Sequence, residues 1–194
     1  MFFQLQEKDV RLPAHMRHVT LIDSKLMGLI INRLCYQLIE NHGDFGNTVV
    51  IGMQPRGIHL AENIVDKLKS IQPKSELHYG IIDPTFYRDD FRRSDTSLIA
   101  MPTDIPFSIE DKHVIIVDDV LYTGRTIRAG IEGLLEYGRP KSVELLVLID
   151  RRFTRELPIQ PMYVGKSVDS YDDQKVRVMW KSDGEEDKVI LLTE

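Results

Sequence analysis

The fold is decided by the stretch Val114-Ile115-Ile116-Val117-Asp118-Asp119-Val120-Leu121-Tyr122-Thr123-Gly124-Arg125-Thr126. Its first four residues are β-branched and apolar, which is typical of a strand buried on both faces of a parallel sheet. Two adjacent carboxylates follow, and then a turn rich in hydroxyl groups and backbone donors that opens a helix. This unit predicts an α/β protein with polar groups at the carboxyl end of a strand, where ligands of such sheets bind.

Sequence on both sides of this unit continues the alternation of strands and helices. Helical spacing of apolar residues predicts a helix from Asp23 or Ser24 to Gly43, a second over Ile58–Leu68, and a third over Thr126–Tyr137 that Gly138 ends. The expected strands are Thr48–Gly52, Leu77–Ile82, His113–Val117 and Val143–Ile149, and a hairpin of Val176–Trp180 and Lys188–Leu192 around Ser182-Asp183-Gly184. Together they predict a central, mainly parallel sheet flanked by helices.

The length of 194 residues fits a single domain, 1–194. Its core is expected over about 20–150, and a small hood with the C-terminal hairpin over about 151–194. Between Pro84 and Pro106 the chain loses periodicity and collects charge. A stretch of this length is uncommon in a compact domain unless it is a mobile functional loop, which we expect over about 84–106. A solvated charged loop is the alternative.

Composition excludes several classes of protein. With 42% hydrophobic and 28% charged residues the chain is neither disordered nor fibrous, and its net charge of −5 gives no general attraction to nucleic acid or to anionic membranes. A single cysteine, Cys35, excludes an intramolecular disulfide and a CxxC zinc site. The apolar runs are shorter than the ~20 residues that span a bilayer, and charges near the N-terminus leave no room for a signal peptide. We therefore expect a cytoplasmic protein.

Residues Asp118–Thr126 have the chemistry of a sugar-phosphate site. The N-terminus of a helix binds phosphate, Gly124 lets the backbone approach it, and Thr123 and Thr126 add hydroxyl donors. Asp118 and Asp119 can accept hydrogen bonds from vicinal sugar hydroxyls and help to hold a hydrated divalent cation. The alternative is a plain connection in which Asp119 or Thr123 caps the helix, which explains one acidic residue but not two. The stretch is not a Walker loop, because GxxxxGK[ST] is absent.

Asp118–Thr126 resembles the ribose-phosphate signature of the type I phosphoribosyltransferases, and Val114–Arg139 resembles the PyrR family of uracil phosphoribosyltransferases that also attenuate pyrimidine operons. The resemblance runs from about residue 20 to 170. It implies the type I phosphoribosyltransferase fold with a small hood, formation of UMP and diphosphate from uracil and 5-phosphoribosyl diphosphate, and a homodimer or homotetramer. Further matching pieces are Pro55-Arg56-Gly57, Phe86–Asp90, Gly138-Arg139-Pro140, Arg155–Ile159 and Tyr163–Lys166.

This resemblance assigns roles to residues. The 5-phosphate is expected on the loop Val120, Leu121, Tyr122, Thr123, Gly124, Arg125 and Thr126, and the diphosphate on the turn Gln54, Pro55, Arg56 and Gly57. Asp118 and Asp119 are expected to bind the ribose hydroxyls and, with the diphosphate and partly through water, Mg²⁺. The catalytic residues are then Arg56, Arg88, Asp118 and Asp119. An ordinary Pro-Arg-Gly turn is the alternative at Arg56, and Arg92 and Arg93 are further cations of the 84–106 loop.

The nucleobase is expected in the segment after Val143–Ile149. Candidates are Arg151, Val164, Lys166 and Val168, whereas Tyr163 fits better as a core residue. Purine-using relatives often carry a carboxylate just before the Thr-Gly pair, where this chain has Tyr122. Because a phenol is a poor proton acceptor near neutrality, uracil fits better than hypoxanthine or guanine.

The resemblance also implies binding of a leader RNA in response to UMP, with Arg33, Arg155 and Lys166 as candidate contacts. Asn32, Tyr36 and Gln160 stand where RNA-binding members are expected to have Thr, His and a basic residue, which weakens this role because phosphate contacts supply most RNA affinity. Three functions remain open: a uracil phosphoribosyltransferase, a UMP-responsive RNA-binding regulator with weak catalysis, and a phosphoribosyltransferase for another base.

Overall fold

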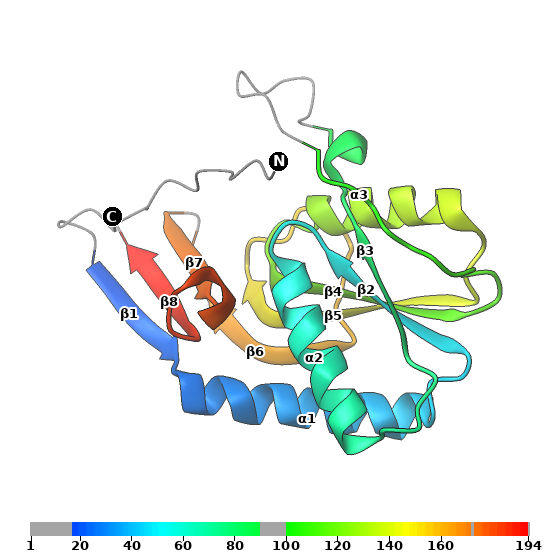
Figure 1. Cartoon of the computed structure of the whole chain (residues 1–194). Helices are drawn as coiled ribbons and strands as arrows, with labels where there is room; N and C mark the ends of the chain where they lie inside the picture. The colour runs from blue at the N-terminus through cyan, green and yellow to red at the C-terminus, as the bar shows by residue number, and fades with distance from the viewer. Residues whose placement is uncertain (1–16, 90–99, 172, 194) are drawn as a thin grey trace, which may run out of the picture.

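The computed structural model describes residues 17–89, 100–171 and 173–193. The strands of this part of the chain form two sheets (Figure 1). The larger sheet is parallel throughout and has the order β3-β2-β4-β5-β6. Its strands are β2 (Thr48–Met53), β3 (His78–Ile82), β4 (His113–Leu121), β5 (Ser142–Arg152) and β6 (Tyr163–Asp169). The predicted α/β class with a parallel sheet flanked by helices is therefore confirmed.

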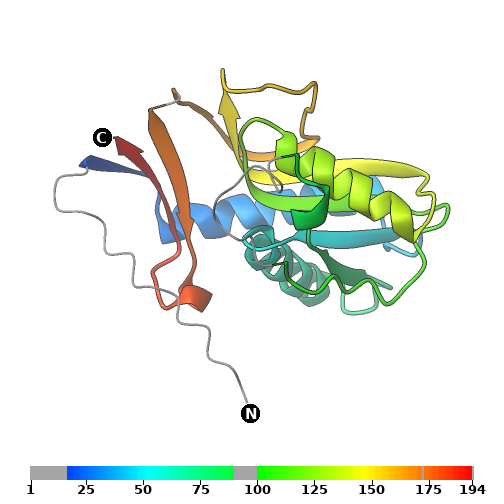
Figure 2. The same cartoon turned by 90° about the horizontal axis from the view of Figure 1, so that it is seen from above.

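Helices cover both faces of the larger sheet. Figures 1 and 2 show α1 (Ser24–His42) and α2 (Gly57–Ile71) on one face and α3 (Arg125–Leu134) on the other. The predicted ends of α1 are confirmed: the Asp23 carboxylate accepts from the Leu26 N–H at 2.8 Å, and Gly43 ends the helix with a positive φ of 61°. No helix in the described part of the chain is long and apolar enough to cross a bilayer.

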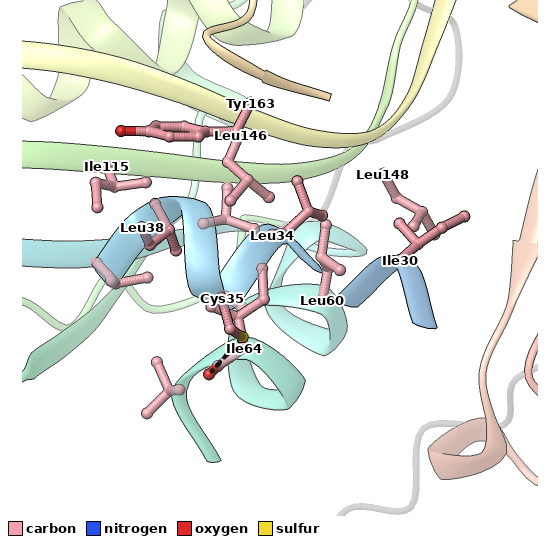
Figure 3. Close-up of a cluster of buried hydrophobic side chains, with 14 of the residues drawn as sticks. Ile30, Leu34, Cys35, Leu38, Leu60, Ile64, Ile115, Leu146, Leu148 and Tyr163 are labelled. Atoms are coloured by element: carbon pink, nitrogen blue, oxygen red, sulfur yellow. Dashed lines mark hydrogen bonds between the residues drawn. The ribbon is translucent and has the colours of Figure 1, made fainter. Parts of the chain in front are cut away.

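The core between the sheet and helices α1 and α2 is the largest apolar cluster (Figure 3). Cys35 lies inside it as a free thiol and contacts the Ile64 carbonyl oxygen at 3.7 Å. Burial raises the pKa of this thiol to about 12, so it stays protonated at neutral pH. A separate cluster fills the opposite face under α3.

The smaller sheet is antiparallel and has the order β1-β8-β7, with β1 at Arg17–Ile22, β7 at Gln174–Met179 and β8 at Lys188–Thr193. The predicted C-terminal hairpin is confirmed. Its connection contains a 3₁₀ turn, η3 (Lys181–Asp183), and Gly184 at φ 80°. The pairing of β1 with β8 was not predicted, because it joins segments that lie far apart in the sequence and depends on tertiary packing.

The structure also differs from the predicted strand boundaries. Strand β4 continues to Leu121, so Asp118 and Asp119 lie within it and not after it. Strand β5 reaches Arg152 because β4 and β6 pair with it on either side, and β6 therefore extends the main sheet beyond residue 150, where we expected the hood to begin. The described ends of the 84–106 segment are ordered: a 3₁₀ turn, η1, forms at Thr85–Tyr87, and Asp104 pairs with Ile81.

Candidate active site

Two adjacent carboxylates lie near the carboxyl end of β4. Asp119 is buried and Asp118 is partly buried. Burial, and then the neighbouring charge of Asp119, raises the pKa of Asp118 well above its usual range. Burial also raises the pKa of Asp119, although the Arg56 guanidinium opposes this shift. Charging both groups is therefore unfavourable, and a ligand that binds the carboxylates reduces the repulsion between them.

This pair fits a magnesium ion. Mg²⁺ is usually held by one or two carboxylates together with water and substrate phosphates, and a divalent cation removes the repulsion that raises the pKa of Asp118. Within the described residues, no group of three or more His, Cys, Asp or Glu side chains is arranged to hold a metal. Asp118 and Asp119 would therefore share the ion with substrate oxygens and water.

The turn before α2 carries the predicted diphosphate residues. Its Gln54–Pro55 peptide bond is cis, and the Gln54 side chain donates to the Pro102 carbonyl oxygen at 2.6 Å. At Gly57, a Cβ atom would lie 2.5 Å from the Val117 carbonyl oxygen and 2.9 Å from the Asp118 Cα. Glycine is therefore required for α2 to begin this close to β4, and the close approach brings the turn beside the carboxylates.

Arg56 connects this turn to the carboxylates. Its Nε lies 3.3 Å from Asp119 Oδ2, and its Nη2 donates to the Val178 carbonyl oxygen in β7. A cleft of about 360 Å³ opens at this contact. It is lined by Arg56, Asp119, Val120, Val176, Arg177 and Val178. The fold thus brings Arg56 of the predicted diphosphate turn and Asp119, one of the two predicted ribose carboxylates, to one cleft, with β7 of the smaller sheet as its other wall.

Residues 122–124 form the turn from β4 into α3, which begins at Arg125. Gly124 has φ 91°, a left-handed conformation that favours glycine, and it precedes the first residue of α3 without a side chain that could cap the helix. The Thr123 carbonyl oxygen accepts from the Glu156 and Leu157 N–H groups at 3.1 and 3.2 Å. The Thr123 carbonyl therefore points towards residues 156–157. This orientation suits a loop that uses its amide groups to bind a phosphate.

Ion pairs connect this loop to its neighbours. Arg155 donates to the Tyr122 carbonyl oxygen at 2.5 Å and pairs with Asp150 at the end of β5. The Arg125 side chain pairs with Glu156 at 2.6 Å and also with Asp89. Arg88 follows η1 at the start of the 84–106 loop. Asp90, Arg92 and Arg93 lie outside the described residues.

Comparison with known proteins decides the family. The profile of the phosphoribosyl transferase domain matches residues 19–182. "Bifunctional protein PyrR" of Ligilactobacillus salivarius is 44% identical over 160 residues, 80% of this chain and 88% of that protein. The protein of the same name from Bacillus subtilis is 37% identical over 173 residues, 88% and 94% of the two chains. The chain belongs to the PyrR family of phosphoribosyltransferases.

Solved structures agree with this PyrR assignment at the level of the fold. A hypoxanthine phosphoribosyltransferase from Staphylococcus aureus has a TM-score of 0.61 at 24% identity over 77% of each chain. A hypoxanthine-guanine phosphoribosyltransferase from Bacillus anthracis has a TM-score of 0.62 at 20% identity, covering 77% of this chain and 83% of that one. The expected type I phosphoribosyltransferase fold is therefore confirmed.

Arg151, a predicted base-binding residue, makes contacts within the protein. Its Nε donates to Ser170 Oγ at 2.7 Å and its Nη2 to the Tyr171 carbonyl oxygen at 2.9 Å, and its guanidinium lies 4.1 Å from the centre of the Tyr122 ring. Arg151 is buried. It thus connects the predicted phosphate loop, residues 120–126, to the segment between β6 and β7, and its contacts favour positioning of Tyr122.

The other predicted base contacts lie on β6. Val168 is buried in the core under α1 and α2, Val164 packs on the opposite face, and Lys166 donates to the Leu21 carbonyl oxygen at 2.9 Å. Tyr163 is a core residue, as the sequence favoured: it is buried, and its hydroxyl donates to Glu144 at 2.9 Å. The structure does not bring these side chains together at the cleft.

The residues predicted to contact RNA also make contacts within the protein. Arg33 is exposed on α1, and its Nη2 donates to the Val164 and Gly165 carbonyl oxygens at 3.0 and 2.7 Å. Lys166 and Arg155 make the contacts given above. Arg33 and Lys166 therefore hold β6 to the N-terminal elements, while Arg155 contacts the predicted phosphate loop at Tyr122.

Sequence reasoning missed two acidic residues near the site. Asp83 accepts from the Thr85 N–H at 2.9 Å and from the Met101 N–H, so it joins both ends of the 84–106 loop. The sequence Asp83-Pro84-Thr85 is a turn signal that could have indicated it. Asp183 lies 3.9 Å from Arg56 Nη2, and no local pattern could have placed it there.

Proposed function

We propose that this PyrR-family chain transfers the 5-phosphoribosyl group of 5-phosphoribosyl diphosphate to N1 of uracil and forms UMP and diphosphate. The observation that carries the proposal is the contact of Arg56 with Asp119 in one cleft. It joins a cation suited to a diphosphate with a carboxylate suited to ribose hydroxyls, beside a helix N-terminus suited to the 5-phosphate.

The residues present suit this displacement. The bond between C1 and the diphosphate oxygen breaks, the bond between C1 and N1 of uracil forms, and the N1 proton passes to the departing diphosphate or to water. Arg56 stabilises the charge on the departing diphosphate, while Asp118 and Asp119 orient the ribose. The phosphate loop fixes the other end of the substrate through the N-terminus of α3. Mg²⁺, when bound at the two carboxylates, would neutralise charge on the diphosphate.

The preference for uracil is supported by Tyr122. Its ring packs on the Arg151 guanidinium at 4.1 Å, so the position before the Thr-Gly pair presents an aromatic ring and not a carboxylate. A phenol does not accept a proton readily at neutral pH, which removes the general base that a purine substrate would use.

The test is incubation of the protein with 5-phosphoribosyl diphosphate, Mg²⁺ and each nucleobase in turn. We expect UMP from uracil, and no turnover from the variant with Asp118→Asn and Asp119→Asn; Asp66→Asn, which changes an exposed carboxylate on α2, is the matched control. Product from guanine with none from uracil would overturn the assignment of the base. Turnover by the double variant would overturn the assignment of the ribose site.

A second function is favoured by the relatives, which are named bifunctional proteins. We propose UMP-dependent binding of the upstream leader RNA as this function, with Arg33, Arg155 and Lys166 as contacts that gain their role when the bound nucleotide changes their surroundings. The test is the RNA affinity measured with and without UMP at several salt concentrations. For a single strand, the logarithm of the affinity falls with the logarithm of the salt concentration, with a slope of ~0.7 for each phosphate that the protein neutralises. An affinity independent of UMP would contradict a regulatory role.

We also infer a homodimer or homotetramer working in the cytoplasm. The family membership supports the assembly, and the free buried thiol of Cys35 supports a compartment where a disulfide is not needed. Light scattering on the purified chain measures the assembly, and a monomer at micromolar concentration would contradict it.

A further inference from the structure

The C-terminal hairpin, by which we mean β7, η3 and β8, contacts the diphosphate turn directly. The Val178 carbonyl oxygen of β7 accepts from Arg56 Nη2. From η3, the Asp183 Oδ2 lies 3.9 Å from the same nitrogen. The cleft at Arg56 therefore has one wall that comes from sequence more than 120 residues away, as the separation of 122 between Arg56 and Val178 shows.

His59, in the first turn of α2, fixes the hairpin at this place. Its Nε2 lies 3.3 Å from Asp183 Oδ1, and its Nδ1 lies 3.1 Å from Ser182 Oγ. Both ring nitrogens thus meet consecutive residues of η3. The ring of Trp180 lies 6.2 Å from the ring of His59 and is fully buried. Asp183 consequently bridges two residues of the turn region, His59 on one oxygen and Arg56 on the other.

We propose that Asp183 and His59 are positioning residues that orient Arg56 for the diphosphate; this rests on the proposed function, in which Arg56 binds that group. Arginine has a long flexible side chain, and its guanidinium is effective only when its plane is fixed. Contacts at Nε and Nη2 with two different elements, β4 and the hairpin, fix that plane. The side chain remains 43% exposed, so a substrate can still reach it.

The hairpin matters most when substrate is bound. Asp119 is a partner of Arg56 in the structure, but it is also the carboxylate expected to bind ribose hydroxyls and Mg²⁺. When Asp119 turns to the substrate, Arg56 loses part of that contact. The Val178 carbonyl and Asp183 then keep the guanidinium at the cleft. This division of roles predicts an effect on substrate binding that is larger than any effect on the chemical step.

The experiment compares Asp183→Asn with Glu185→Gln, which removes the same charge from an exposed position of the same turn. Calorimetry gives the Kd of 5-phosphoribosyl diphosphate without turnover, and UMP formation gives KM and kcat. Because Asp183 and Arg56 form a partly exposed pair, we expect Kd and KM to rise about threefold in Asp183→Asn, with kcat within about twofold of wild type. Glu185→Gln should match wild type.

A double-mutant cycle separates positioning from a structural role. If Asp183 acts through Arg56, Asp183→Asn adds nothing to the loss of affinity already caused by Arg56→Gln. The fluorescence of Trp180, the single tryptophan of the chain, reports whether the hairpin stays docked in each variant. If Asp183→Asn does not fold, His59→Gln replaces it in the same cycle, because it removes the other half of the bridge.

The outcomes distinguish the two proposals. The positioning role would be overturned if Asp183→Asn and Glu185→Gln bound 5-phosphoribosyl diphosphate equally well. It would also be overturned if Asp183→Asn lowered this affinity by the same factor in the wild-type and Arg56→Gln backgrounds. In either case, UMP formation by the wild-type chain would still support the proposed function. A wild-type chain that binds no 5-phosphoribosyl diphosphate would overturn the proposed function and this inference with it. Binding without UMP formation would contradict the proposed reaction with uracil, and the positioning test would still be decided by Kd.

Discussion

Asp118 and Asp119 lower the stability of the folded chain, because both carboxylates are removed from water. Each is at least partly buried, and each has a raised pKa, so the folded chain binds their protons more tightly than the unfolded chain does. For a group with a raised folded pKa, the stabilising contribution is present below the unfolded pKa of ~4 and is lost as pH rises through the folded value. The pair therefore lowers the stability of the ligand-free protein near neutrality.

The first prediction concerns Asp118→Asn. In the structure, Asp118 Oδ1 accepts from the Asp119 N–H at 2.9 Å. Asparagine keeps an oxygen that can accept this hydrogen bond, but it removes the buried charge and its repulsion with Asp119. We expect the melting temperature at pH 7 to rise, by about 2–4 °C for each kcal/mol relieved. Thermal unfolding between pH 4 and pH 7 measures this.

The advantage of this variant over wild type should grow as the pH rises and nearly vanish at pH 4, where the wild-type carboxyl is protonated. A pH-independent difference, or a lower melting temperature at pH 7, would contradict the charge repulsion. Asp66→Asn on the exposed face of α2 is the control, and it should leave the pH dependence unchanged.

At the scale of elements, the site depends on how closely β4, α2 and α3 approach one another. Local patterns predicted most of this: the apolar run before Asp118 gave the strand, and Gly57 and Gly124 stand where α2 and α3 begin. The sequence did not predict that β4 runs on to Leu121, because pairing with β5 and not local preference extends it. Nor did it place Val178 and Asp183 beside Arg56, because that contact depends on tertiary packing.

The second prediction is at the start of α2. In Gly57→Ala the new methyl group would meet the Val117 carbonyl oxygen at 2.5 Å, so α2 must move away from β4. We expect a loss of about 1–3 kcal/mol in the free energy of unfolding and weaker binding of 5-phosphoribosyl diphosphate. Urea unfolding and calorimetry measure the two effects.

The matched control is Gly28→Ala. Gly28 is an exposed position of α1 where a Cβ meets nothing within 4 Å, so alanine should stabilise the helix by about 0.5–1 kcal/mol. If Gly57→Ala were as harmless as Gly28→Ala, the close approach of α2 to β4 would not be needed for the site.

The third prediction separates a phosphate-loop role of Arg155 from an RNA role. Arg155→Gln removes the contact that holds the Tyr122 carbonyl and leaves Asp150 without its cation. A hydrogen bond from a charged group contributes about 1.5–3 kcal/mol, so we expect KM for 5-phosphoribosyl diphosphate to rise about tenfold or more.

Arg152→Gln is the control for Arg155→Gln, since Arg152 is exposed and pairs with Asp169 at the surface. It should leave KM unchanged. Normal KM for Arg155→Gln with weaker RNA binding would show that Arg155 serves the nucleic acid and not the loop.

At the scale of the whole molecule, both sheets contribute to the apolar cluster that α1 and α2 cover. Ile22 of β1, Val178 of β7 and Val189 of β8 belong to the same apolar cluster as the buried faces of α1 and α2. Trp180 is in this cluster as well. The smaller sheet is therefore packed on the domain, which supports treating the described chain as one cooperative unit.

The fourth prediction follows from this shared core. Unfolding in guanidinium chloride should give the same midpoint when followed by Trp180 fluorescence, which reports on the smaller sheet, and by far-UV circular dichroism, which is dominated by the helices. An earlier fluorescence transition would show that the smaller sheet detaches first and that the cleft loses its second wall before the domain unfolds.

The pairing of β1 with β8 also bears on how the protein is made. Arg17 and Thr193 are partners although nearly the whole described chain lies between them. Because the ribosome releases the N-terminal part of the chain first, β1 cannot pair with β8 until β8 has left the exit tunnel. The parallel sheet can assemble earlier, but β7, which holds Arg56 at the cleft, pairs with β8 and gains this neighbour only after β8 has emerged, so the second wall of the cleft is completed after the sheet that carries Asp119.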